Sequence, residues 1–171
     1  INGGYILAQG NDGASAIGGV PTDYVTWSES SGKRQCGSIT INGGIVRTEP
    51  VTMHTTPSNV GIGSGPLGYG GSVTINGGTV MANATADAIC TGRGGSITIN
   101  GGIVCTELRT SGGAHTADSF GIGTCYGNGG SVTINGGVIH AVGKGSAAGI
   151  GSTGDIRITG GELAVFAEDH V

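Results

Sequence analysis

One seven-residue phrase recurs along this chain and constrains its fold more than any other feature. It is written SITINGG or SVTINGG and begins at Ser38, Ser72, Ser96 and Ser131. When the repeats are aligned on Asn-Gly-Gly, the Asn positions are 2, 42, 76, 100 and 135, and Thr159 takes the sixth place. The intervals are 40, 34, 24, 35 and 24 residues, so the minimal repeat has 24 residues and the longer repeats carry insertions. A fixed period of this kind is typical of solenoids and propellers.

Within each repeat, apolar residues alternate with small hydroxylated ones, as in Ser-Ile-Thr-Ile-Asn. This period of two predicts a β-strand with one buried and one exposed face. A second strand after Asn-Gly-Gly and a recurrent isoleucine late in the repeat supply two further walls. The expected inward columns are Ile39, Val73, Ile97, Val132 and Ile156; Ile41, Ile75, Ile99, Ile134 and Ile158; Val46, Val80, Val104, Ile139 and Leu163; and Ile17, Ile62, Ile89, Ile122 and Ile150.

Asn-Gly-Gly forms the corner between strands, because Asn tolerates the left-handed conformation and glycine adopts positive φ at little steric cost. Stacked coils would place the Asn side chains above one another as an internal hydrogen-bonded ladder. We therefore predict an all-β fold, a right-handed parallel β-helix of about six coils, as a single domain over residues 1–171. The handedness follows from the general rule for crossover connections. The alternative is a series of hairpins in a sandwich or propeller, since Asn-Gly also favours hairpins.

Composition and charge narrow the class of protein. Glycine supplies 39 of the 171 residues, but no Gly-X-Y period exists, which excludes collagen. The net charge of −4 gives no basic surface for nucleic acid. No run of about 18 apolar residues is present to span a membrane. The chain begins with INGGYILAQG, the tail of the repeated phrase, so we expect it to be part of a longer protein.

The pattern GIGSG…GGSVTINGGxVxA resembles the glycine-rich β-helical repeats of large bacterial surface proteins, particularly those of Gram-positive gut and soil anaerobes. The resemblance covers the chain from Asn2 to Gly161, apart from the insertions. It implies a scaffold outside the cell or on the bacterial cell surface, and some of these repeats are described as carbohydrate-binding. The four cysteines and the long polar insertions depart from the regularity of such repeats.

The first candidate site consists of aromatic residues in the insertions. Tyr24, Trp27, Tyr69 and Tyr126 follow the recurrent isoleucine in three coils and therefore fall along one edge of the solenoid. Exposed rings offer flat apolar faces to sugars and anchors to proteins; alternatively, these rings fold over the insertions as small cores. Our main hypothesis is a non-catalytic extracellular or cell-surface module, without a cofactor, that binds a glycan or an extracellular or host protein.

The second candidate is an outward array of hydroxyl groups. Two files would cross the coils, about 6.7 Å apart along a strand, with about 4.8 Å between coils. Their members are Ser38, Thr40, Ser72, Thr74, Ser96, Thr98, Ser131 and Thr133. Flat arrays of this kind resemble the ice-binding faces of β-solenoid antifreeze proteins, although Ser and Thr also suit any exposed strand face. Asp155 and Arg157 interrupt the array in the last coil.

A polysaccharide-degrading enzyme is the third hypothesis, because parallel β-helices host lyases and hydrolases. Glu49 and Glu107 occupy equivalent positions two coils apart, hence about 9–10 Å by coil spacing. That separation is at the outer limit for an inverting pair of carboxylates. Nothing obvious in their surroundings would desolvate either group, so we expect both to be ordinary solvated carboxylates. Their neighbours in register are Asn83, Arg47, Arg109 and His140.

Cysteine and histidine spacing predicts a disulfide but no metal site. No CxxC motif exists, and the four His are not spaced as ligand pairs. Cys90 and Cys125 fall at the same landmark in successive coils, two positions apart. A disulfide between them would fit an extracellular location. Cys36 and Cys105 map to different walls and should not pair.

Overall fold

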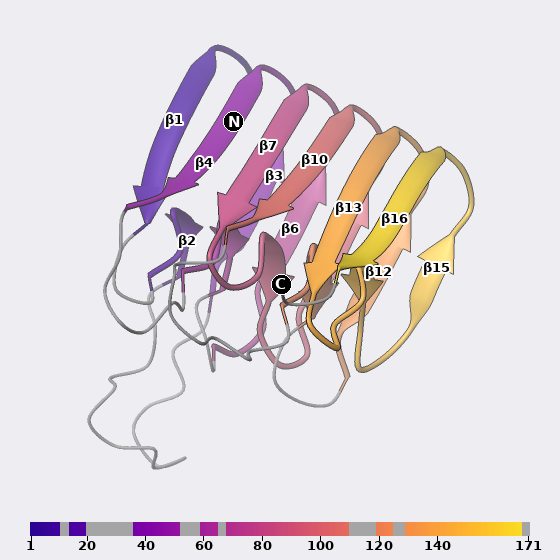
Figure 1. Ribbon diagram of the computed structural model, residues 1–171. Helices are drawn as coiled ribbons and strands as arrows, with labels where there is room; N and C mark the ends of the chain where they lie inside the picture. Colours follow the sequence, from indigo (N-terminus) through magenta and orange to yellow (C-terminus); the bar gives the residue numbers. More distant parts are fainter. Residues whose placement is uncertain are drawn as a thin grey trace.

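The computed structural model describes residues 1–10, 14–19, 36–51, 59–64, 68–109, 119–124 and 129–168. Within these residues the chain contains strands β1 to β16 and no helix. Three sheets run along the molecule, and the chain contributes strands to them in rotation as it winds (Figure 1). All pairings between the named strands are parallel. The structure therefore confirms a parallel β-helix of about six coils and excludes the series of hairpins.

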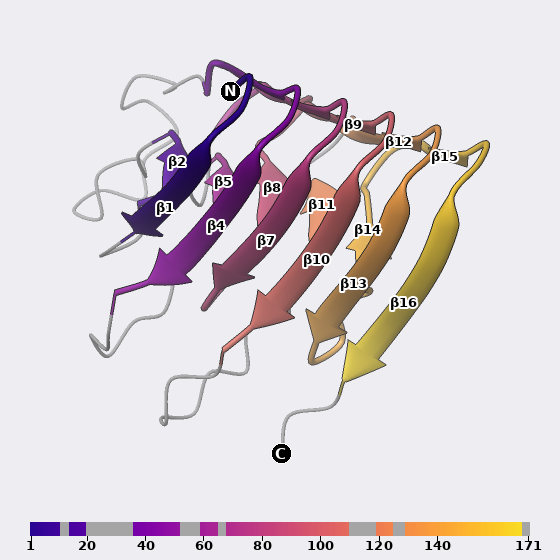
Figure 2. The same ribbon diagram turned by 90° about the horizontal axis from the view of Figure 1, so that it is seen from above.

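The largest sheet, which we call the long sheet, contains the strand that follows each Asn-Gly-Gly corner and, in the last coil, Thr-Gly-Gly. Figure 2 shows its strands side by side in chain order. In that order they are β1 (Tyr5–Gly10), β4 (Ile45–Pro50), β7 (Thr79–Ala84), β10 (Ile103–Leu108), β13 (Val138–Lys144) and β16 (Glu162–Glu168). Each neighbouring pair is joined in register, so residues at the same offset from the corner form a file across the sheet.

The two other sheets have five strands each. The Ser/Thr sheet holds the repeated phrase in β3 (Ser38–Ile41), β6 (Ser72–Ile75), β9 (Ser96–Ile99) and β12 (Ser131–Ile134), and it ends with β15 (Ile156–Ile158). The short sheet holds the recurrent isoleucine in β2 (Ile17–Gly18), β5 (Ile62–Gly63), β8 (Ile89–Thr91), β11 (Ile122–Thr124) and β14 (Ile150–Gly151).

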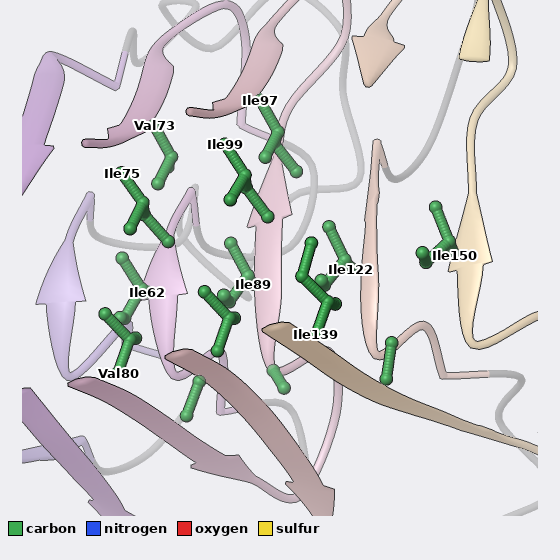
Figure 3. Close-up of a cluster of buried hydrophobic side chains, with 14 of the residues drawn as sticks. Ile62, Val73, Ile75, Val80, Ile89, Ile97, Ile99, Ile122, Ile139 and Ile150 are labelled. Atoms are coloured by element: carbon green, nitrogen blue, oxygen red, sulfur yellow. The ribbon is translucent and has the colours of Figure 1, made fainter. Parts of the chain in front are cut away.

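The inward columns meet in one main apolar core between the sheets (Figure 3). Ile75 and Ile99 are completely buried there, and each such isoleucine contributes about 1.5–3 kcal/mol relative to an exposed one. The columns lose their cover at the last coil, where Ile156 and Ile158 are 45% and 51% exposed although they occupy inward positions. A coil thus depends on its neighbours to bury its apolar residues.

The second glycine of each corner meets two physical requirements. Gly78 has φ of 87°, a left-handed conformation that other residues adopt at a cost. A Cβ atom built on Gly78 would lie 2.6 Å from the carbonyl oxygen of Gly44 in the preceding coil. Only glycine therefore allows both the turn and the close stacking of one corner on the next.

The corner asparagines form the expected hydrogen-bonded ladder, but they form it at the surface. Nδ2 of Asn42 donates to Oδ1 of Asn2 at 2.7 Å, and the same bond joins each later Asn to the one before it. Thr159 ends the ladder by donating to Oδ1 of Asn135 at 3.0 Å. The prediction of an internal ladder is wrong, because Ile41 points inward and strand alternation turns the next residue, Asn42, outward.

Candidate functional site

The Ser/Thr sheet carries the hydroxyl array in register on its outer face. Ser38, Ser72, Ser96 and Ser131 form one file, and Thr40, Thr74, Thr98 and Thr133 form the other. Ser38 and Thr40 at the edge are exposed, while their counterparts on the inner strands are half-buried. Ser72 donates to Ser38 between neighbouring coils at 3.0 Å. Arg157 takes the next place after Thr133, so the threonine file ends at β12.

Tyr69 is the one member of the predicted aromatic group that lies within the described residues; Tyr24, Trp27 and Tyr126 lie outside them. Tyr69 pairs with Arg93 of the next coil through a parallel bridge. The guanidinium carbon of Arg93 lies 5.4 Å from the centre of the Tyr69 ring, and Nη1 donates to the phenol oxygen at 3.3 Å. Both side chains are half-buried. This edge of the solenoid, which we call the loop edge, therefore presents the Tyr69 ring packed against the Arg93 guanidinium.

Glu49 is not the solvated carboxylate expected from the sequence. Its side chain is only 16% exposed, and it pairs with Arg47 of its own strand and with Arg109 two coils away. Nδ2 of Asn83 donates to the same carboxylate at 3.3 Å. Burial raises the pKa of Glu49, but the hydrogen bond from Arg47, the charges of both arginines and the bond from Asn83 outweigh it, so the pKa is lowered.

Glu107 differs from Glu49 in its surroundings. Its side chain is 61% exposed, and its closest cation is Nε of Arg109, 3.6 Å from Oε1. Asn83 is its register partner on β7, which confirms the expected order Glu49, Asn83, Glu107 across the coils. The guanidinium of Arg109 therefore interacts with both carboxylates. The pKa of Glu49 is lowered, whereas a general acid needs a raised one.

An exposed apolar file on the long sheet was missed by the sequence analysis. Its members stand three residues after the first residue of each corner, and the apolar ones are Tyr5, Ile45, Ile103 and Val138. The half-buried Thr79 interrupts the file, and Glu162 takes the position in the last coil. Tyr5 is 63% exposed, and the two isoleucines and the valine are 43–47% exposed. The signal was present in the sequence, since alternation places this position outward wherever the fourth residue is inward. Exposed apolar residues that lie together mark interaction surfaces.

Asp87 is a buried acid that the sequence analysis also missed. It lies between β7 and β8, and only 6% of it is exposed. Its Oδ1 accepts a hydrogen bond of 2.7 Å from the backbone N–H of Phe120 in the next coil. Burial raises the pKa of Asp87 to about 7, although the bond from Phe120 acts in the opposite direction. This carboxylate serves the stacking of two coils rather than an exposed site.

The cysteines fall into two groups. Cys90 is buried and takes part in a disulfide, and its predicted partner Cys125 lies outside the described residues. Cys36 and Cys105 are free, as expected from their different walls. Cys36 is buried and donates to the carbonyl of Gly63, whereas Cys105 is half-buried on the outer face of β10.

Comparison with known proteins gives no relative of this chain. No family model matches it, and neither a curated protein nor a solved structure does. In the described part of the chain, no helix is long and apolar enough to cross a membrane. The chain is therefore classed by its fold, as a parallel β-helix, and its function has to be argued from its own surfaces.

Proposed function

We propose that this chain is a non-catalytic extracellular or cell-surface module that binds a glycan or another protein through the loop edge of the solenoid. The pairing of Tyr69 with Arg93 at that edge is the observation that carries the proposal. A tyrosine ring offers an apolar face to a sugar ring, and a guanidinium offers donors to a carboxylate or hydroxyl. The pair therefore favours glycans, and acidic glycans above neutral ones.

The scaffold supports this role because it holds the pair on neighbouring coils. Tyr69 and Arg93 are joined by backbone hydrogen bonds on both sides, from Gly70 to Arg93 and from Arg93 to Gly68. Binding groups on a rigid framework lose little conformational entropy when a ligand arrives. Trp27 in the preceding coil and Tyr126 are the further aromatic residues that we assign to this edge from the sequence. The disulfide at Cys90 supports an extracellular location.

A glycan array with neutral and acidic oligosaccharides tests the proposal. We expect Tyr69→Ala and Trp27→Ala each to weaken binding by about tenfold or more, the scale found for aromatic anchors at interfaces. Tyr5→Ala is the matched control, because Tyr5 is a more exposed tyrosine on the long sheet. A ligand whose binding survives both loop substitutions but is lost in Tyr5→Ala would place the site on the long sheet instead.

Ice binding is the second candidate function, and the register of the hydroxyl files favours it. Two files of four residues cross neighbouring parallel strands without a break. The resulting lattice of hydroxyl groups has spacings of about 4.8 Å by about 6.7 Å and repeats from coil to coil. A regular hydroxyl surface can order water in a way that scattered surface hydroxyls cannot.

Thermal hysteresis of the purified chain tests this second candidate. Thr98→Tyr places a large ring in the middle of the array and should abolish hysteresis. Thr79→Tyr is the control, since it adds the same ring to an outward position of the long sheet. If the wild-type chain neither lowers the freezing point nor shapes ice crystals at high concentration, the ice-binding hypothesis is wrong.

A further inference from the structure

Two sulfur donors and one nitrogen donor lie in one file on the outer face of the long sheet. β10 runs between β7 and β13, and the register places Cys105 beside Met81 on one side and beside His140 on the other. Register partners on parallel strands lie about 4.8 Å apart and project from the same face of the sheet. His140 is exposed, and Met81 and Cys105 are half-buried, so all three reach the surface.

The file contains a thioether, a thiol and an imidazole, and the thiol of Cys105 is free. Thiolate and thioether sulfur are soft ligands that select copper(I), and imidazole also suits copper. Calcium and magnesium take oxygen ligands, which this file lacks. No three His, Cys, Asp or Glu side chains gather as a metal site in the described part of the chain, so a zinc site of the usual composition is not present there. We propose that Met81, Cys105 and His140 bind one copper(I) ion.

The spacing of the strands suits three ligands around one ion. An ion bound over Cys105 on the central strand, β10, lies about 4.8 Å sideways from each of the flanking strands, β7 and β13. Methionine is long and unbranched, so its sulfur can lean across that distance, and the imidazole of His140 can do so from the other side. The ion replaces the thiol proton, which passes to solvent, and the thiolate sulfur forms the new bond.

The surroundings of the file also favour a soft cation of low charge. The apolar file flanks it, since Ile103 and Val138 stand two residues before Cys105 and His140 on the same face and are 46% and 47% exposed. The centre of the Phe166 ring lies 5.2 Å from the centre of the His140 imidazole. Phe166 belongs to β16, which adjoins β13 on the side away from β10. These apolar side chains lie beside the donors and disfavour strongly hydrated ions.

The file carries donors in three consecutive coils only. At the same offset from the corner, the other coils have Leu7, Arg47 and Ala164. The donors therefore do not follow from the repeat, which elsewhere places an apolar or cationic side chain at this position. The repeat merely supplies the register that brings three unlike residues together.

Anaerobic titration with copper(I), in competition with bicinchoninate and with the Cys90 disulfide kept intact, tests the proposal. We expect one tightly held ion per chain, with no retained copper in Cys105→Ser. Met81→Leu and His140→Gln should each weaken the affinity at least about tenfold, the lower limit for loss of a supporting group at a metal site. Cys36→Ala removes the other free thiol, which is buried, and should leave the affinity unchanged.

A second measurement uses the wild-type chain and does not depend on the folding of any variant. Bound copper(I) should protect Cys105 from alkylation by iodoacetamide, as read by peptide mass spectrometry. X-ray absorption should show two sulfur ligands and one nitrogen. Failure to retain copper, loss of binding in Cys36→Ala, or unchanged affinity in both Met81→Leu and His140→Gln would overturn the three-ligand site.

Discussion

Arg109 interacts with Glu49 across two coils: its Nη1 lies 3.0 Å from Oε2 of that glutamate, while its Nε lies 3.6 Å from Oε1 of Glu107. The two carboxylates that the sequence marks as a candidate catalytic pair are thus joined by one guanidinium. A general acid needs a raised pKa at neutral pH, and the pKa of Glu49 is lowered. Glu49 therefore stays ionised at neutral pH, and its ion pair with Arg109 joins two coils on the outer face of the long sheet.

We predict that the chain does not cleave polysaccharides. Pectin, alginate, hyaluronan and mucin glycans, incubated with and without Ca²⁺, should release no product that reducing-end or absorbance assays detect. The physical reason is that the carboxylate positioned by several partners, Glu49, stays ionised. Product formation that Glu107→Gln abolishes would make this chain an enzyme and contradict the binding-module proposal.

The ion pairs of Glu49 should make a measurable contribution to stability. Because the pKa of Glu49 is lowered in the folded chain, this contribution is fully present above the ordinary glutamate pKa of 4.5. It is lost as the pH falls through the pKa that Glu49 has in the folded chain. Arg47 and Arg109 are 40% and 44% exposed, so solvent screens both pairs. We expect Glu49→Gln to lower the free energy of unfolding by about 1 kcal/mol at pH 7.

Urea unfolding at several pH values measures this effect. The difference between the wild type and Glu49→Gln should shrink as the pH falls below about 4. Glu107→Gln is the control, and it should change stability by no more than about 0.5 kcal/mol because Glu107 is largely exposed. An equal loss in both variants at pH 7 would show that Glu49 has no special contribution.

Asp87 should give the opposite dependence on pH. Its pKa is raised from 3.8 to about 7, so between these values the folded chain binds a proton that the unfolded chain releases. Stability should therefore fall as the pH rises through this range, by on the order of a few kcal/mol in total. Asp87→Asn keeps an oxygen acceptor for Phe120 and should remove that slope, whereas the exposed Asp155→Asn should leave it unchanged. Parallel slopes for the wild type and Asp87→Asn would contradict the assignment.

The asparagine ladder should require an amide on each inner rung. In Asn76→Asp, the side chain can no longer donate to Oδ1 of Asn42, and two acceptor oxygens face each other instead. We expect a loss of about 1–2 kcal/mol in urea unfolding at pH 7. Thr159→Asn is the matched control, because it replaces one donor to Asn135 by another at the end of the ladder. Its stability should stay within about 0.5 kcal/mol of the wild type; a smaller loss in Asn76→Asp than in this control would contradict the role of the ladder.

The disulfide of Cys90 should involve Cys125, the cysteine that remains when the free Cys36 and Cys105 are set aside. Cys125→Ser should lower the free energy of unfolding by about 3 kcal/mol under oxidising conditions. Reducing agent should destabilise the wild type by a similar amount and leave the variant unchanged. Peptide mapping without reduction checks the pairing, and a linkage of Cys90 to any other cysteine would show that the predicted pairing is wrong.

The architecture could be predicted from the sequence because its signals are local. Alternation in Ser-Ile-Thr-Ile fixes which side of a strand is buried, and the corner glycines fix where the chain turns. The period then sets the register, since a slip of one residue would expose every inward isoleucine. The same alternation also indicates that Asn42, the residue after the inward Ile41, points outward, and this contradicts the expectation of an internal ladder.

The contacts that define the candidate sites depend on residues far apart in the chain. Offsets from the corner Asn align Met81, Cys105 and His140, but their exposure beside the apolar file is a property of the folded long sheet. The ion pair between Arg109 and Glu49 follows from side-chain conformations, and the burial of Asp87, which accepts a hydrogen bond from Phe120, follows from the local exclusion of water. The repeat itself determined the coils and their register. Only the tertiary structure decided which charges are paired and which are buried, because Coulomb interactions and desolvation depend on distances across coils that no local pattern encodes.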